Sequence, residues 1–388
     1  MARHAGSTQD VGGSVDHGAY HGREQALLKH EVLKSYLETW GFKLGSIAKT
    51  RQIKLWYVDC FAGPWKSADQ EHRDTSVGIG LDVLTTVERT WREQGIAVPI
   101  EAIFVEKDAS AFAELETFVE KNKGVLGTTC IHGAFEDQIS FLREKINDDD
   151  PALVFVDPLG WSGASLQTLR PLTGNRYREV LVNVMSSFAH RFTGAENAEE
   201  SIRAMLDLDD SHVLDRMTEE QLSGLYRRRL KETCGYRYAL DIAIPAPNQD
   251  RIWYRLVLGT NSEKGVEVFR NAEARMAKTA GDARASAKRR KEVAKSNQPD
   301  LFAPAPDLFI ENRLNDAVEL AERRLPEAAG KGRLWRDVWP EVLEDVHVRK
   351  PELNKLAKKL LDEGTLEFLG WQPRQRAPKD DQLVRSKK

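Results

Sequence analysis

The sequence predicts an α/β protein in which a largely parallel sheet is covered by helices on both faces. Short apolar runs, typical of buried strands, alternate with longer amphipathic runs, typical of helices, over the first half of the chain. The clearest strand-like run is 55–58, which ends at Asp59 and a turn closed by Gly63 and Pro64. Because parallel strands need crossover connections, the alternation favours a parallel sheet.

The elements follow in order along the chain. Apolar residues recur every three to five positions over 24–40, which predicts an amphipathic helix before the first strand. The same patterns predict strands at 100–105, 128–131, 152–156 and 180–184, and helices at 77–94, 110–123 and 137–146. Residues from about 189 to 235 are helix-rich and charged, and we expect them to form a helical insertion over the carboxyl edge of the sheet. Two strand-like runs, 236–244 and 251–259, are separated by PAPNQD and predict a hairpin.

Five alternating strands followed by a hairpin are the order expected of a Rossmann-like class I methyltransferase sheet. We therefore expect such a domain at 23–277, after a flexible tail at 1–22. A basic helix and a Pro-rich linker are predicted at 278–310. The stretch from Arg270 to Lys295 contains nine basic and three acidic residues, and the Pro-rich sequence NQPDLFAPAPD follows it. Three helical patterns and a short strand predict a winged-helix-like domain at 311–372, followed by a flexible basic tail at 373–388.

The composition is that of a globular chain long enough for two domains. The sequence has 388 residues, 41% of them hydrophobic and 30% charged, with a formal net charge of −3. It contains no apolar run long enough to cross a membrane, and its first residues lack the apolar core of a secretion signal. The three cysteines (Cys60, Cys130 and Cys234) have no disulfide-framework or zinc spacing. A cytoplasmic location is therefore expected.

Three acids fall at the carboxyl ends of predicted strands: Asp59, Glu106 and Asp157. The carboxyl ends of parallel strands line the crevice in which open α/β sheets bind ligands. After a second strand, an acid such as Glu106 is placed to accept hydrogen bonds from ribose hydroxyls. The alternative for the opening strand is a buried strand followed by an ordinary turn.

The sharpest motif is Asp157-Pro158-Leu159-Gly160-Trp161, directly after the fourth strand. Enzymes that methylate an exocyclic or amide nitrogen use Asp-Pro and an aromatic residue to hold the amine, and the aromatic face stacks a base that has left its duplex. We therefore predict Asp157, Pro158 and Trp161 as catalytic residues. The alternative is that Asp157 caps the following helix and Pro158 begins it.

The ordered set of KHEVLKSYLETW, VDCFAGP, FVEKD, VFVDPLGW, NVMSSFAHRF and GTNSEKG resembles the bacterial three-Cys-motif partner protein (TcmP) family over roughly residues 23–277. The resemblance implies a class I methyltransferase fold and a partner protein with a three-cysteine motif similar to radical SAM enzymes. It also implies a cofactor loop for S-adenosylmethionine, with Glu106 as the ribose acid; the predicted loop residues are Asp59, Phe61, Ala62 and Gly63. Trp65 stands where family members commonly have glycine.

Two functions are consistent with these observations. The first is an S-adenosylmethionine-dependent methyltransferase acting on a nitrogen of a nucleic acid. The predicted nucleic-acid contacts are basic side chains of the basic helix and of the recognition helix of the winged-helix-like domain, namely Lys288, Arg289, Arg290, Lys355, Lys358 and Lys359. The second is a non-catalytic adaptor that works with the three-Cys-motif partner. Winged helices also dock proteins, so that role for the domain stays open.

Overall fold

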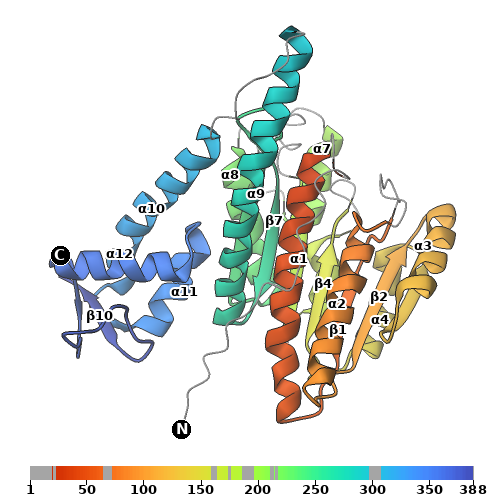
Figure 1. The fold of residues 1–388 in the computed structure, drawn as a ribbon, viewed down its shortest axis with the longest axis horizontal. Helices are drawn as coiled ribbons and strands as arrows, with labels where there is room; N and C mark the ends of the chain where they lie inside the picture. Colours follow the sequence, from red (N-terminus) through yellow and green to blue (C-terminus); the bar gives the residue numbers. More distant parts are fainter. Residues whose placement is uncertain are drawn as a thin grey trace.

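The computed structural model describes residues 20, 23–63, 72–158, 164–173, 176–185, 196–209, 214, 217–296 and 307–387. Its centre is a seven-stranded sheet of order β3-β2-β1-β4-β5-β7-β6 (Figure 1). The strands are β1 (Leu55–Asp59), β2 (Ile100–Glu106), β3 (Gly127–His132), β4 (Ala152–Val156), β5 (Arg178–Val184), β6 (Tyr238–Pro245) and β7 (Ile252–Thr260). Strands β1 to β5 are parallel, whereas β7 runs antiparallel to both of its neighbours, β5 and β6. The predicted α/β class, parallel sheet and hairpin are confirmed.

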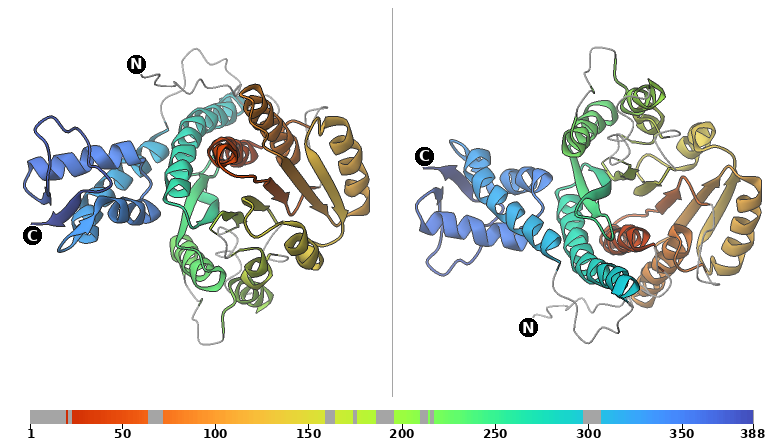
Figure 2. Two further views of the ribbon diagram at one scale, coloured as in Figure 1. Left: turned by 90° about the horizontal axis from the view of Figure 1, so that it is seen from below. Right: turned by 90° about the horizontal axis from the view of Figure 1, so that it is seen from above.

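Helices cover both faces of this sheet (Figure 2). One face is covered by α1 (Glu24–Gly45), α2 (Ser76–Glu93), α3 (Ala109–Asn122) and α9 (Glu263–Ser296). The other face is covered by α4 (Ile139–Lys145), α5 (Leu166–Leu169), α7 (Glu196–Leu206) and α8 (Glu219–Cys234). Short 3₁₀ turns lie at η2 (Ser46–Lys49), η3 (Phe135–Gln138) and η4 (Arg170–Leu172).

Strands β1, β4 and β5 are buried at every residue, which explains their largely apolar sequences. Along β1, Leu55 and Tyr57 pack into the core beneath α1 and α2, and Trp56 and Val58 pack into the core beneath α4 and α5. Side chains of a strand alternate between its two faces, so residues two apart share a core. Asp59 therefore lies on the α1 side of the sheet.

Local capping sets where the helices begin and end. Thr218 and Gln221 form a capping box at the start of α8, and Gly235 ends that helix with a left-handed backbone, φ +74°. Five buried side chains of α8 belong to the core beneath α4 and α5: Leu222, Leu225, Tyr226, Leu230 and Cys234. The predicted insertion over the carboxyl edge is therefore wrong for α8, because this helix packs on a face of the sheet as an ordinary crossover helix does.

The C-terminal module has its own small sheet. It consists of α10 (Leu308–Ala329), β8 (Arg333–Leu334), α11 (Trp335–Asp345), α12 (Lys350–Asp362), β9 (Leu366–Phe368) and β10 (Leu383–Ser386). Strand β10 lies in the middle of this antiparallel sheet, between β8 and β9. The predicted flexible tail at 373–388 is therefore wrong where β10 forms, since the buried Val384 and the ladder hold that segment.

Buried polar contacts join the C-terminal module to the large sheet beside α9 (Figure 1). The guanidinium of Arg270, on α9, is fully buried and donates to the backbone carbonyls of Asp241, Leu343 and Glu344. The Glu344 carboxylate accepts the backbone N–H of Ala239 on the edge strand β6 at 2.9 Å. A carboxylate thus satisfies an edge-strand donor that would otherwise face a neighbouring element unpaired.

No helix among the residues described combines the length and the hydropathy that crossing a bilayer requires.

The buried ion pair of Asp241 generates a stability prediction. Burial opposes ionisation of Asp241, but Arg255, His347 and Arg227 hold the pKa of this carboxyl well below its usual range. Replacing Asp241 by Ala leaves the buried guanidinium of Arg255 with one acidic partner fewer. We expect Asp241→Ala to lower the free energy of unfolding by about 3 kcal/mol, measured by urea denaturation.

The matched control removes an ion pair at the surface. Glu199 pairs with Arg203 at 2.7 Å, and its side chain is 51% exposed. Glu199→Ala should therefore change stability by about 0.5 kcal/mol or less. Equal effects of the two substitutions would show that burial of the Asp241 pair has no special weight.

Candidate active site at the carboxyl edge of the sheet

The register of the sheet brings the three predicted acids to one edge. Asp59 of β1 lies opposite Phe104 of β2 and Phe155 of β4. Glu106 and Asp157 each lie two residues beyond these partners, so they face the same side of the sheet as Asp59. Because neighbouring strands are about 4.8 Å apart, the three acids lie on adjacent strands across roughly 10 Å. The juxtaposition expected from the sequence is present, and the roles of the acids stay predictions.

Asp59 is fully buried and has one oxygen without a partner. Its Oδ1 accepts the backbone N–H of Phe61 at 3.2 Å, whereas Oδ2 has no hydrogen-bond partner within the described part of the chain. Burial raises the pKa of Asp59 to about 7 against the lowering effect of the Ser76 side chain, and the Asp157 carboxylate raises it further. Such an acid favours a ligand that brings a positive charge or a donor.

Glu106 is in direct contact with the glycine turn. Its Oε1 accepts the backbone N–H of Asp108 at 2.6 Å. A Cβ placed on Gly63 would come within 2.5 Å of the Glu106 Oε2, so a larger residue here would require the Glu106 carboxylate to move. The turn is tied to β2 by the hydrogen bond from the Ala62 N–H to the Val105 carbonyl, 2.9 Å long. This is the arrangement that a ribose-binding acid beside a small-residue loop requires.

Asp157 is engaged by two side chains of the protein itself. Lys29 of α1 forms an ion pair with Oδ2, and Asn183 of β5 donates from Nδ2 to Oδ1 at 2.6 Å. An ammonium group therefore already meets Asp157 where the sequence analysis expects the acceptor amine. The next helix that the structure describes, α5, is capped by Ser165, which does not support the alternative role of Asp157 as its cap.

Of the remaining residues of the predicted site, the structure describes some and leaves others out. Pro158 is buried beside Asp157, and the half-buried Phe61 ring packs on Phe135 at 5.9 Å between ring centroids. Trp65 and Trp161 lie outside the described residues.

Three buried polar atoms at this edge lack a partner among the residues described: Tyr57 Oη, Asp59 Oδ2 and Asn183 Oδ1. All three side chains face the α1 side of the sheet, on β1 and β5, with Asp157 between them on β4. Burial raises the pKa of Tyr57 well above its usual value, so its hydroxyl stays a donor. Other buried polar atoms of the described residues also lack a partner, but these three share one side of the sheet, where a polar ligand would satisfy them.

Sequence reasoning missed the contribution of α1 and β5 to this site. Lys29 of α1 pairs with Asp157, and the neighbouring His30 is buried against Tyr20, with 2.9 Å between its Nδ1 and the Tyr20 Oη. Burial lowers the pKa of His30 well below its usual value, with Lys29 and Arg23 adding to the effect, so the ring is neutral. Periodicity identifies the helix, but it does not show which residues of the helix meet the sheet edge.

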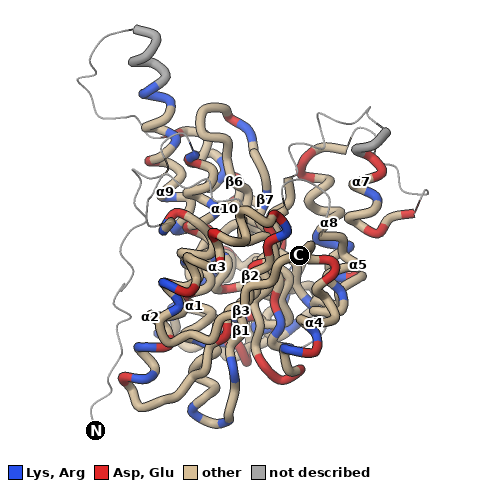
Figure 3. Tube along the Cα trace, turned by 90° about the vertical axis from the view of Figure 1, so that its right-hand side faces the viewer, with Lys and Arg blue, Asp and Glu red and all other residues tan. Residues whose placement is uncertain are grey.

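The predicted basic helix is engaged with the body of the protein. Lys288 pairs with Asp250 at 3.1 Å and with Asp307 at 3.2 Å, Arg290 pairs with Glu24, and Arg289 also has a partner. In the charge-coloured view, Lys and Arg positions are interspersed with Asp and Glu positions and do not form one large patch (Figure 3).

The predicted recognition helix α12 carries exposed lysines. Lys358 pairs with Asp362 at 2.7 Å and Lys359 pairs with Glu322 at 2.6 Å, while Lys355 is exposed. Exposed ion pairs of this kind contribute little stability, so these lysines can exchange a carboxylate for another anion.

The strand order defines the class of this domain. A seven-stranded sheet of order β3-β2-β1-β4-β5-β7-β6 with an antiparallel β7 is the sheet of class I methyltransferases. The predicted fold class is thereby confirmed.

Comparisons with known proteins find only distant likenesses to solved structures. No model of a known protein family matches the chain, and no curated protein matches it. Among solved structures, a methyltransferase from Podospora anserina bound to SAH has 10% identity and a TM-score of 0.27, covering 58% of this chain and 78% of that one. Loganic acid methyltransferase with SAH has 8% identity and a TM-score of 0.31, covering 75% and 94%. A protein from Legionella pneumophila has 8% identity and a TM-score of 0.32, covering 60% and 85%.

The raised pKa of Asp59 predicts a pH-dependent stability. The folded-state value of about 7 lies above the value of about 4 expected in the unfolded chain, so the folded protein holds this proton more tightly. The resulting stabilisation is complete below pH of about 4 and is lost as pH rises through about 7. We expect Asp59→Asn, which cannot ionise, to gain a few kcal/mol relative to wild type between pH 5 and pH 8 in urea denaturation.

The control removes an exposed carboxylate from the same layer of the protein. Asp82→Asn, on the outer surface of α2, tests whether loss of any negative charge gives this gain. A difference between Asp59→Asn and wild type that is equal at both pH values would contradict burial of the charge.

Proposed function

We propose that this protein is an S-adenosylmethionine-dependent methyltransferase of the three-Cys-motif partner family, acting on a nitrogen of a nucleic acid. The observation that carries the proposal is the cluster of unpartnered polar atoms of Tyr57, Asp59 and Asn183 at the carboxyl edge. Asp59 and Asn183 lie near the carboxyl ends of their strands, where open α/β sheets bind their ligands.

The residues of this edge fit the cofactor. Glu106 would hold the ribose hydroxyls, Gly63 leaves room for close approach of the nucleoside, and Asp59 would face a positive or hydrogen-donating group. S-adenosylmethionine supplies a methyl group on a positively charged sulfur, whose leaving tendency makes a strong general base unnecessary.

The protein's own residues would act mainly by alignment. The Asp157 carboxylate and the Pro158 carbonyl would accept hydrogen bonds from the N–H groups of the acceptor amine. The lone pair of the amine would then point away from these two groups. The carboxylate then supports the amine as it becomes positive and receives its proton, directly or through water. Lys29 must give up Oδ2 of Asp157 for this to happen, because it holds that oxygen in the structure.

The C-terminal module would hold the nucleic acid. Its order of helix, strand, two helices and two strands is that of a winged helix, in which α12 would be the recognition helix. Lys355, Lys358 and Lys359 lie on this helix, and Lys288, Arg289 and Arg290 on α9 would provide further, separate contacts. Binding through phosphates would replace their present carboxylate partners.

A second candidate function is that of a non-catalytic adaptor for the three-Cys-motif protein. One observation favours it: both oxygens of Asp157 are occupied, by Lys29 and Asn183. An adaptor would keep the fold and deliver nucleic acid to its partner without transferring a methyl group itself.

Cofactor binding tests the proposal first. Calorimetry with S-adenosylmethionine and S-adenosylhomocysteine should detect binding to the wild-type protein. Asp59→Asn and Glu106→Gln should each weaken it by about tenfold or more, since a charge-assisted hydrogen bond is lost. Glu101→Gln, at the opposite end of β2, is the matched control and should bind as wild type does. Equal binding by all four proteins would remove the proposed site.

Methyl transfer then separates the enzyme from the adaptor. Asp157→Asn should bind the cofactor as wild type does but lose about a hundredfold or more of its transfer of labelled methyl to pooled nucleic acid. Wild-type protein that transfers no methyl group, yet co-purifies with the three-Cys-motif protein, would favour the adaptor.

A further inference from the structure

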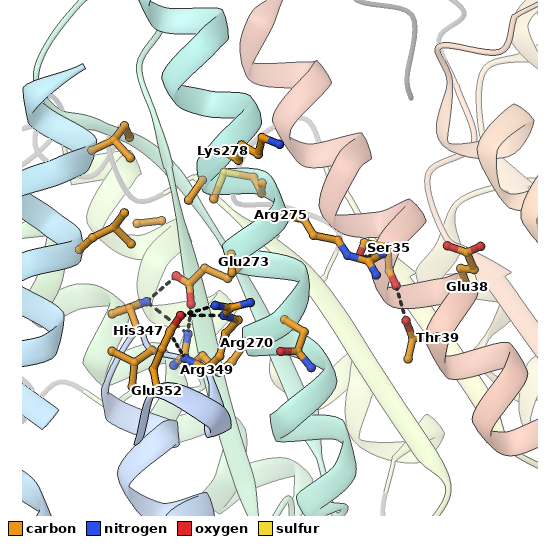
Figure 4. Close-up of a pocket in the computed structure, with 18 of the residues that line it drawn as sticks. Ser35, Glu38, Thr39, Arg270, Glu273, Arg275, Lys278, His347, Arg349 and Glu352 are labelled. Carbon is orange, nitrogen blue, oxygen red and sulfur yellow. Dashed lines mark hydrogen bonds and ion pairs between the residues drawn. The ribbon is translucent and has the colours of Figure 1, made fainter. Parts of the chain in front are cut away.

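A groove of about 1250 Å³ lies away from the carboxyl-edge site, between the large sheet's helices and the C-terminal module. Its walls come from α1, the end of α2, α9, α10 and the start of α12 (Figure 4). The volume exceeds the roughly 300–1,000 Å³ of sites that take one small molecule. An extended occupant is therefore more suitable than a single metabolite.

The groove is positively charged. Six Lys and Arg side chains line it against three Glu, an excess of three positive charges. Two of the three acids are already engaged by basic partners, Glu273 by Arg270 and Glu352 by Arg349. Three of the cations have no ion pair within the described residues, and each comes from a different helix: Lys43, Lys278 and Arg313.

The environment of two of these cations points to a missing anion. Burial lowers the pKa of Lys43, and the neighbouring Lys264 and Lys350 lower it further although Glu267 opposes them. Burial also lowers the pKa of Arg313, and the charge of Arg255 adds to this effect, although Glu273, Glu219 and Asp241 oppose it. Partly desolvated cations that lack a carboxylate partner gain most from a bound anion.

Neutral and apolar side chains fill the space between the charges. Hydroxyl and amide groups line the α1, α2 and α9 walls at Ser35, Thr39, Thr90, Gln94 and Asn271. Arg275 reaches from α9 to the Ser35 hydroxyl, at 3.3 Å (Figure 4). On the opposite wall, Leu314 of α10 is 45% exposed, and Phe42 lines the groove from α1. Such a lining can contact base faces and base edges between phosphates.

From these observations we propose that the groove binds a single strand of nucleic acid. Phosphates would contact Lys43, Lys278 and Arg313, and unpaired bases would lie against Phe42 and Leu314. A duplex hides its base faces and would leave the apolar wall uncovered. An acidic peptide would also satisfy the cations, and the competition experiment below distinguishes it from a nucleic acid. This proposal rests on the proposed function only in assuming that the substrate is a nucleic acid, and it does not depend on methyl transfer.

The test measures fluorescence anisotropy of labelled oligouridylate and oligodeoxythymidylate of about 12 nucleotides, over about 50 to 200 mM salt, with the full chain. The double variant Lys43→Glu, Lys278→Glu should bind at least about tenfold more weakly than wild type. The slope of log K against log salt concentration should also be smaller for this variant. The loss of one to two phosphate contacts predicts a decrease of roughly 0.7 for each contact.

The matched control makes the same charge change elsewhere. Lys121→Glu, Lys145→Glu alters two exposed lysines of α3 and α4, and it should bind the strand as wild type does. Circular dichroism and S-adenosylmethionine calorimetry establish that both double variants are folded.

Four results would overturn the inference: equal losses in both double variants, no loss in the groove variant, tighter binding of a duplex of the same length, or displacement of the strand by polyglutamate at matched charge.

A loss of binding confined to the variant Lys355→Glu, Lys358→Glu would place the strand on α12 instead. If the groove variant binds both the cofactor and the oligonucleotide as wild type does, the proposed function remains possible but the groove is not the binding site. Strand binding in the groove without any cofactor binding would leave the groove standing without the methyltransferase.

Discussion

The reversal of strand order at β1 is the constraint on which the site depends. The chain proceeds from β1 outward to β2 and β3, then crosses back to place β4 on the other side of β1. The connections on either side of this point leave in opposite directions, and a crevice opens between the two strand ends. Asp59 and Asp157 flank that crevice because both follow strands that meet there. A strand order in which β1 and β4 were not neighbours would separate these two acids.

Much of the fold could be predicted because it depends on short-range patterns. Parallel strands buried on both faces have continuous apolar sequences, and β1, β2, β4 and β5 can each be located from such runs. The position of β10 could not be predicted in this way, since its pairing with β8 and β9 depends on contacts with residues far away in sequence. Likewise, the charged sequence of α8 conceals the apolar stripe, Leu222, Leu225 and Leu230, that places it on the sheet.

The site was predicted in part, for a similar reason. Acids that directly follow strands are visible in sequence, because the edge of the sheet collects them without further information. The side chains that complete their environment arrive from elsewhere: Lys29 from a helix that precedes the sheet, and Asn183 from the fifth strand. The only local indication of a role for Asn183 is that it is a polar residue inside the otherwise apolar run 180–184 of β5. The large groove leaves no such sign, since six separate segments line it.

The contact of Glu344 with the outer strand has a consequence for how copies of this protein can associate. Strand β6 is one border of the seven-stranded sheet, and α11 covers it while the Glu344 carboxylate occupies the Ala239 amide. A second molecule therefore cannot extend the sheet across that border without displacing the C-terminal module. The opposite border, β3, is only partly buried and keeps its outer backbone groups free of any neighbouring strand in this sheet. Dimers built by joining sheets edge to edge would have to form through β3.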